Sequence, residues 1–206
     1  MSVLRSFLAV ALLASTSLLS HASLINGSFE SGLTGWTVSK SGSFGSGTSP
    51  ANVTDGTTSA RMWSYTSCAT SGCGAFSYTA GNYIGLAQTF DMSGINDIYF
   101  DAYLGGAPNP GTSYQSFMTA AAYIGATQVW NSQAIGQYLD INIDVSALVG
   151  LQTLEFRIEA IGNGVDAKSD HLYIDNVRAP SAVPEPATLG LFGLGLAALG
   201  FARRKA

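Results

Sequence analysis

Residues 97–104 read Asp-Ile-Tyr-Phe-Asp-Ala-Tyr-Leu (DIYFDAYL), and apolar and polar side chains alternate along them. One face carries the apolar side chains of Ile98, Phe100, Ala102 and Leu104. The other face carries Asp97, Tyr99, Asp101 and Tyr103. A period of two is typical of a β-strand that buries one face. We therefore predict a strand here whose apolar face packs against a second layer of the protein.

The same alternation recurs at residues 139–145 (LDINIDV) and 154–160 (LEFRIEA). Further strands are predicted at residues 25–30, 60–65, 83–90, 117–124, 127–130 and 172–178. Residues 39–59 are polar and rich in glycine, which predicts a mobile loop. No long amphipathic helix pattern occurs. Many short strands with glycine-rich connections favour an all-β fold, an antiparallel β-sandwich of the jelly-roll kind.

The first 22 residues have the pattern of a secretory signal peptide. Arg5 precedes an apolar run at residues 7–14, and Ser20-His21-Ala22 supplies small residues at the positions that signal peptidase reads. We predict cleavage after Ala22. An uncleaved membrane anchor is the alternative, but the apolar run is shorter than the ~20 residues that a span needs.

Residues 183–206 read VPEPATLGLFGLGLAALGFARRKA. The triplet Pro184-Glu185-Pro186 precedes residues 187–202, which carry no charge, and Arg203, Arg204 and Lys205 follow. At ~1.5 Å per residue, a helix over 187–202 would be about 24 Å long, which predicts a single transmembrane helix with its basic tail (203–205) in the cytoplasm. A buried helix of a globular domain is the alternative. The lack of a polar face and the basic cluster weigh against it.

The order of triplet, apolar segment and basic tail resembles the PEP-CTERM sorting signal of Gram-negative bacteria that make exopolysaccharide. This resemblance implies that an exosortase processes the chain after signal peptidase has acted. The chain would be exported and held for a time in the inner membrane by its C-terminal helix. It would then pass to the cell surface or the extracellular matrix.

Residues 23–182 remain between these two segments, a suitable length for one domain. They contain five basic and twelve acidic residues, a net charge of −7. Such a surface repels nucleic acid, so no nucleic-acid partner is expected, and it suits divalent cations or neutral partners.

Cys68 and Cys73 lie close together in the sequence of an exported chain, which predicts a disulfide. The alternative is a zinc site, but no histidine lies near them in the sequence.

Three further stretches carry a second resemblance. Residues 24–30 (LINGSFE) lead to Gly35-Trp36, residues 86–90 read LAQTF, and residues 172–177 read LYIDNV. Over residues 24–179 the chain resembles the jelly roll of carbohydrate-binding modules, the galactose-binding-like sandwich. The resemblance implies that the first and last strands lie side by side.

The same resemblance implies a structural calcium ion with the carboxylates of Glu30 and Asp175 among its ligands. Calcium is a hard cation that takes six to eight oxygen ligands. The alternative is that Glu30 accepts hydrogen bonds from backbone amides and that Asp175 caps a β-bulge, because the alternation falters at Asp175-Asn176-Val177. No other cofactor is expected.

A glycan site needs exposed aromatic rings and polar groups that reach hydroxyls. Five residues are candidates for glycan contact: Trp63, Tyr65, Tyr99, Asp101 and Tyr103. The alternative is that these aromatic side chains only pack against their cross-strand neighbours.

Catalytic patterns are weak. His171, beside Asp170, is the one histidine left after export, and no G-x-S-x-G turn presents a serine to it. Glu155 and Glu159 lie on one face of a strand, about 13 Å apart at ~3.3 Å per residue. This distance is too long for the two carboxylates of a glycosidase, so we interpret residues 155–159 as a solvated charge row.

We predict a non-catalytic surface or matrix protein with weak binding to exopolysaccharide. A structural or adhesive protein without a sugar site is the second hypothesis, and a hydrolase with an unrecognised site is the third.

Overall fold

The computed structural model describes residues 23–64, 76–107, 116–166 and 169–180. Every regular element in these ranges is a strand. The strands are β1 (Thr37–Ser41), β2 (Phe44–Ser49), β3 (Ser59–Ser64), β4 (Phe76–Tyr78), β5 (Tyr83–Asp91), β6 (Asp97–Ala107), β7 (Met118–Ile124), β8 (Thr127–Ser132), β9 (Gly136–Asp144), β10 (Leu151–Ala160), β11 (Gly164–Asp166) and β12 (Ser169–Arg178). In the part of the chain so described, no helix could cross a membrane.

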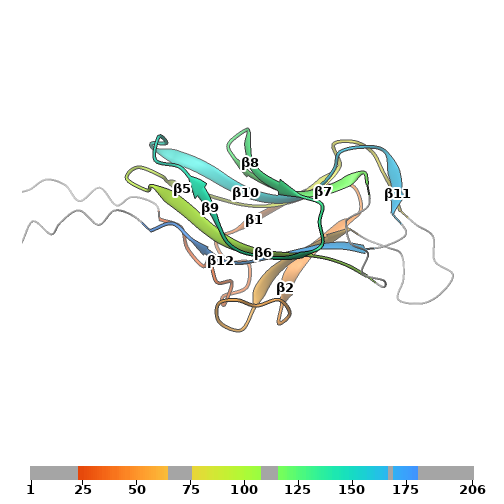
Figure 1. Ribbon diagram of the computed structural model, residues 1–206, viewed down its shortest axis with the longest axis horizontal. Coiled ribbons are helices and arrows are strands. Elements are labelled where there is room, and N and C mark those ends of the chain that lie inside the picture. The colour runs from red at the N-terminus through yellow and green to blue at the C-terminus, as the bar shows by residue number, and fades with distance from the viewer. Residues whose placement is uncertain (1–22, 65–75, 108–115, 167–168, 181–206) are drawn as a thin grey trace, which may run out of the picture.

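The strands form two five-stranded antiparallel sheets that pack as two layers (Figure 1). Sheet A has the order β1-β5-β10-β7-β8, and sheet B has the order β2-β3-β12-β6-β9. A small pair, β11 with β4, lies at one end of the sandwich. The predicted antiparallel sandwich of the jelly-roll kind is confirmed.

The core lies between β6 of sheet B and β10 of sheet A. Ile98, Phe100 and Leu104 of β6 are fully buried, as the alternation of residues 97–104 predicts. Leu154, Phe156 and Ile158 of β10 are buried in the same way. The rings of Phe100 and Phe156 meet edge to face with centroids 4.8 Å apart and so join the layers. Each such burial stabilises the fold by about 1.5–3 kcal/mol.

Two predictions near the N-terminus of the domain are wrong. Residues 25–30 form turns rather than a strand, since Asn26 and Phe29 adopt positive φ angles of 51° and 57°. The Asn26 side chain donates to the Gly32 and Thr34 carbonyls, which stabilises the turn. The segment still contacts the last strand, because the Val177 amide donates to the Gly27 carbonyl at 3.0 Å.

Residues 39–59 do not form one long loop. They contain the end of β1 and all of β2, which pairs with β3 from Phe44↔Ser64 to Ser49↔Ser59. The Phe44 ring is buried in the core, while Gly45 and Gly47 occupy the alternate positions. The composition did not predict this strand, because two of its six residues are glycines, which lack a side chain.

The alternation of residues 139–145 holds only in part. Asp140 has a φ of 51°, and the register between β6 and β9 shifts between Phe100 and Ala102. This bulge moves Tyr138 to the core side and leaves Leu139 58% exposed. The pattern alone could not show an inserted residue.

Several predicted features lie outside the described residues. They are the signal peptide (1–22), the disulfide between Cys68 and Cys73, the side chain of Tyr65, and the transmembrane helix with its basic tail (187–205). These features stay predictions.

Candidate functional site

The outer face of sheet A carries a polar cluster centred on Arg157 of β10. Since Phe156 and Ile158 face the core, Glu155, Arg157 and Glu159 point outward. The register places Tyr83 of β5 beside Glu159. It places Tyr123 of β7 beside Glu155.

Arg157 lies between two aromatic rings and two carboxylates. Its guanidinium carbon is 4.6 Å from the ring centroids of both Tyr83 and Tyr123. Its Nη2 donates to Glu155 Oε2 at 2.6 Å, and its Nη1 is 3.9 Å from Glu159 Oε2. This cluster, the Arg157 cluster, therefore combines ion pairs with cation–π contacts.

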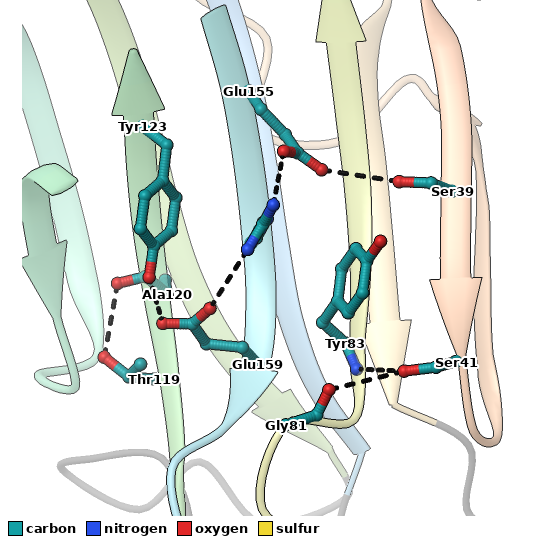
Figure 2. Close-up of polar contacts among 10 residues, drawn as sticks. Ser39, Ser41, Gly81, Tyr83, Thr119, Ala120, Tyr123, Glu155 and Glu159 are labelled. Carbon is teal, nitrogen blue, oxygen red and sulfur yellow. Dashed lines mark hydrogen bonds and ion pairs between the residues drawn. The ribbon is translucent and has the colours of Figure 1, made fainter. Parts of the chain in front are cut away.

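Hydroxyl groups complete the hydrogen bonding of both carboxylates (Figure 2). The Tyr123 hydroxyl donates to Glu159 Oε1 at 2.6 Å, and the two side chains point toward one another. The Ser39 hydroxyl donates to Glu155 Oε1 at 3.4 Å. Burial, and then the hydrogen bond to Glu159, raise the pKa of Tyr123 to about 12. The phenol therefore stays protonated, as a donor, at neutral pH.

The interpretation of residues 155–159 as a solvated charge row is wrong. The side chains of Arg157, Glu155 and Glu159 are only 26%, 12% and 16% exposed. Gly85 of β5 makes room for this packing, because a Cβ there would lie 2.0 Å from Glu155 Oε1. The two carboxylates are joined by one cation instead of facing solvent separately.

A hollow of about 260 Å³ lies beside this cluster, along β7 and β8. It is lined by Thr119, Gln128, Asn131, Ser132, Gln133, Glu159 and Ile161. Gln128 and Asn131 are exposed, and their side-chain amides make no hydrogen bond to a described residue. The hollow therefore offers amide donors and acceptors, two hydroxyls and one carboxylate in a small space.

Two of the predicted glycan contacts lie together on the outer face of sheet B. Trp63 of β3 and Tyr103 of β6 flank β12, which places His171 beside Trp63 and Tyr173 beside Tyr103. The rings of Tyr103 and Tyr173 meet edge to face at 5.9 Å. Both rings of the sequence prediction are thus on one surface, although 40 residues separate them in the chain.

The other two described candidates have structural contacts. Asp101 is 5% exposed and accepts hydrogen bonds from the Asp140 amide at 2.7 Å and from Asn176 Nδ2 at 3.0 Å. The guanidinium of Arg178 lies 4.9 Å from the centroid of the Tyr99 ring. Asp101 therefore holds the bulges of β9 and β12 together, and Arg178 covers the Tyr99 ring.

The carboxylate of Glu30 binds the segment that precedes β3. Its Oε1 accepts hydrogen bonds from the amides of Thr57 at 2.7 Å and Thr58 at 2.8 Å, and its Oε2 from the Thr57 hydroxyl at 2.7 Å. Hydrogen bonds from the Thr57 hydroxyl and amide and from the Thr58 amide lower the pKa of Glu30 to about 2.

Asp175 binds the same segment. Its Oδ2 accepts from the amides of Thr54 at 2.6 Å and Asp55 at 2.9 Å, and its Oδ1 from the Asn176 amide at 2.8 Å. The register of β12 against β6 shifts between Asp175 and Arg178, as the bulge interpretation requires.

Both carboxylates therefore make the contacts of the alternative to calcium binding. Amide donors take up the oxygens that an ion would need. Across residues 23–64, 76–107, 116–166 and 169–180, no three His, Cys, Asp or Glu side chains gather to hold a metal. A calcium ion at Glu30 and Asp175 stays a prediction.

The described neighbours of His171 include a hydroxyl and a guanidinium. Its Nε2 lies 2.7 Å from the Ser169 hydroxyl and 3.2 Å from Arg61 Nη2. Burial, and then repulsion by the Arg61 cation, lower the pKa of His171 to about 4. Its neighbour Asp170 is buried and, by alternation, faces the opposite side of the sheet.

Reasoning from the sequence missed Tyr83, Tyr123 and Arg157 as one site. Each lies in a strand that the sequence predicts, but only cross-strand register brings them together. The one local signal was the charged alternation of residues 154–160, which shows that β10 has a polar outer face.

Comparison of the fold with solved structures gives remote similarities. A family 11 carbohydrate-binding module from Clostridium thermocellum, in complex with a β-1,3-1,4-mixed-linked tetrasaccharide, aligns with 80% of this chain and 98% of its own at 13% identity and a TM-score of 0.43. The module TmCBM61, in complex with β-1,4-galactotriose, aligns with 79% of this chain and 99% of its own at 14% identity and a TM-score of 0.43. The K2 cleaved adhesin domain of Lys-gingipain aligns with 72% of this chain and 89% of its own at 13% identity and a TM-score of 0.45.

At the level of sequence, no curated protein shows significant similarity to this chain. One family model matches, and it covers residues 182–205. The sorting signal expected from the triplet, the apolar segment and the basic tail is thereby confirmed. Residues 182–205 are a PEP-CTERM protein-sorting motif.

Proposed function

We propose that this protein is an exported, exosortase-sorted, non-catalytic surface protein that binds a neutral glycan on the outer face of sheet A. The observation that carries the proposal is the hollow beside Tyr123, where the amides of Gln128 and Asn131 have no partner among the described residues. The PEP-CTERM motif supports the location, since it implies export and sorting to the surface. There the domain would meet the exopolysaccharide of the cell.

The chemistry of the hollow suits a sugar ring. Sugars present hydroxyls that both donate and accept hydrogen bonds, and a side-chain amide offers both functions in one plane. The hollow is smaller than the ~300–1,000 Å³ of sites that enclose a drug-sized ligand. It would therefore hold about one sugar unit of a chain that runs along the sheet.

The Arg157 cluster argues against glycoside hydrolysis at this face. A glycosidase places two carboxyl groups on either side of the bond that it cleaves. Here Glu155 and Glu159 lie on one strand, and the guanidinium of Arg157 occupies the space between them. The Arg157 cluster instead forms a polar surface next to the hollow, held in place by its ion pairs and hydrogen bonds.

The test is retention of the full-length chain by neutral polysaccharides in affinity gel electrophoresis, after a glycan array has selected the polymers. The variant Gln128→Ala with Asn131→Ala should lose about tenfold in affinity, because two hydrogen bonds to the sugar are removed. Asn142→Ala is the matched control, since Asn142 is an exposed amide on β9 of sheet B and pairs with Tyr99. Equal retention of all three proteins would refute the proposed site. Retention by no neutral glycan would favour a purely structural or adhesive role.

A further inference from the structure

The outer face of sheet B carries an arginine among aromatic side chains. We call this surface the Trp63 face and define it by Arg61, Trp63, Tyr103, His171 and Tyr173. The guanidinium carbon of Arg61 is 4.7 Å from the centroid of Trp63 and 5.7 Å from that of Tyr173. Its Nη2 lies 3.2 Å from Nε2 of His171.

Arg61 has no carboxylate partner among the described residues. The other two arginines there are paired, Arg157 with Glu155 and Arg178 with Asp140. In the sequence, residues 65–75, which follow β3, and residues 108–115, which follow β6, include no Asp or Glu. Lys40 also lacks a carboxylate among the described residues, but its Nζ donates to the Phe44 carbonyl at 3.0 Å.

The surroundings of Arg61 hold its charge in place without neutralising it. Its Nε is buried and has no hydrogen-bond partner among the residues that the structure describes. His171, whose pKa is lowered to about 4, is neutral at pH 7. The Ser169 hydroxyl donates to the Ser64 carbonyl, so Nε2 of His171 donates to Ser169, and its Nδ1, 3.5 Å from Nη2, is the nitrogen that can accept from Arg61. Aromatic rings attract the cation through their faces but carry no charge. The guanidinium is thus oriented before any ligand arrives.

Glycines allow the rings of the Trp63 face to lie along the sheet. A Cβ at Gly45 would be 2.5 Å from the Trp63 ring, so that ring lies over β2. A Cβ at Gly105 would be 2.8 Å from the Tyr103 ring. The two glycines leave room for the Trp63 and Tyr103 rings close to the backbone of the sheet, and both rings are only partly buried.

We propose that the Trp63 face is a second binding site, for a glycan that carries carboxylates, such as one in which uronic acids alternate with neutral sugars. Arg61 would pair with the carboxylate, and Trp63 and Tyr103 would stack on the sugar ring. An arginine suits this role because its planar fork matches a carboxylate. Spaced carboxylates are favoured over a densely charged polymer, because the domain as a whole is acidic. The site uses no residue of the neutral-glycan site on sheet A.

Titration of the full-length chain with hyaluronan fragments, in which glucuronate alternates with a neutral sugar, tests this proposal. We expect binding that falls by roughly tenfold when the carboxyl groups are reduced to alcohols, and by a similar factor in the variant Arg61→Gln. Added salt should weaken the interaction, since it screens the charge pair. Arg61→Lys should retain part of the affinity, which separates loss of charge from loss of packing.

Arg178→Gln is the matched control, because it removes one positive charge from the same sheet but from an arginine that already has a carboxylate partner. It should bind hyaluronan as the wild type does. Equal binding of reduced and unreduced fragments, or equal losses in Arg61→Gln and Arg178→Gln, would overturn the proposal. So would a lack of any binding to hyaluronan fragments.

The proposal for the Trp63 face and the proposal for the sheet A site can be refuted independently. The double variant at Gln128 and Asn131 should leave hyaluronan binding unchanged. Loss of hyaluronan binding in that variant would contradict a site on the Trp63 face. Hyaluronan binding without retention by neutral glycans would count against the sheet A site alone.

Discussion

The charge of Glu30 depends on the fold. Hydrogen bonds from Thr57 and Thr58 lower its pKa from the ordinary 4.5 to about 2. The unfolded chain therefore binds a proton at a higher pH than the folded chain does. The stabilisation is fully present above about pH 5 and is lost as the pH falls from 4.5 toward 2.

The first prediction follows from this shift. Glu30→Gln should lower the stability at pH 7 and flatten its dependence on pH between about 5 and 2, measured by urea unfolding at a series of pH values. Asp97→Asn is a suitable control, because Asp97, at the start of β6, accepts no side-chain hydrogen bond from a described residue. Thermal melts with and without a chelator test the calcium ion on the same protein. If the chelator leaves the midpoint of thermal unfolding unchanged, Glu30 and Asp175 do not bind a structural calcium ion.

The second prediction concerns Arg157. Arg157→Met leaves Glu155 and Glu159 without their common cation, in a setting where each side chain is less than one fifth exposed. We expect a loss of about 1–3 kcal/mol in the free energy of unfolding. Arg178→Met should cost only about 0–1 kcal/mol, because its partner Asp140 is 70% exposed. Similar losses in the two variants would show that the Arg157 cluster is no stronger than a surface ion pair.

At the scale of elements, the N-terminal segment and β12 approach closely at Gly27. A Cβ on Gly27 would lie 1.9 Å from the Val177 carbonyl oxygen, which is a backbone atom and cannot swing away. The Gly27 carbonyl accepts a hydrogen bond from the Val177 amide, so the two segments hold each other in place. No side chain other than hydrogen fits between them.

The third prediction is therefore that Gly27→Ala destabilises the domain by about 2–4 kcal/mol, measured by thermal and urea unfolding. Gly47→Ala on β2 is the comparison, since its Cβ would make an ordinary contact at 3.9 Å with the Trp63 ring. If Gly27→Ala were as stable as Gly47→Ala, the close contact at β12 would not be a feature of the folded protein.

For the whole molecule, the sorting motif and the sandwich have separate roles. The fourth prediction is that deleting residues 183–206 leaves the fold intact but prevents retention by the membrane, so the protein passes to the soluble exported fraction. Cell fractionation followed by immunoblotting measures this change. Replacing Pro184, Glu185 and Pro186 with alanine should instead leave an unprocessed, membrane-bound chain, because the apolar segment remains while the exosortase signal is lost. Unaltered sorting in both variants would contradict the role of the motif.

The class of fold and the sorting signal of the protein could both be predicted from the sequence. Alternation is a local property, and a strand such as β6 or β10 shows its buried face in eight residues. The sorting signal is also local, since its triplet, apolar segment and basic tail follow one another without interruption. Both could therefore be predicted before any contact was known.

Which polar residues meet depends on how the strands pair in the folded domain. Ser39 reaches Glu155 across 116 residues of chain, and Tyr83, Tyr123 and Arg157 come together from three strands. Such contacts depend on cross-strand register, and a shift of one residue would turn each side chain to the other face. The bulge at Asp140 and the room left by Gly85 and Gly45 depend on neighbouring strands in the same way. The physical reason is that strand formation follows from the order of neighbouring residues, whereas a site on a sheet requires strands that are distant in the chain.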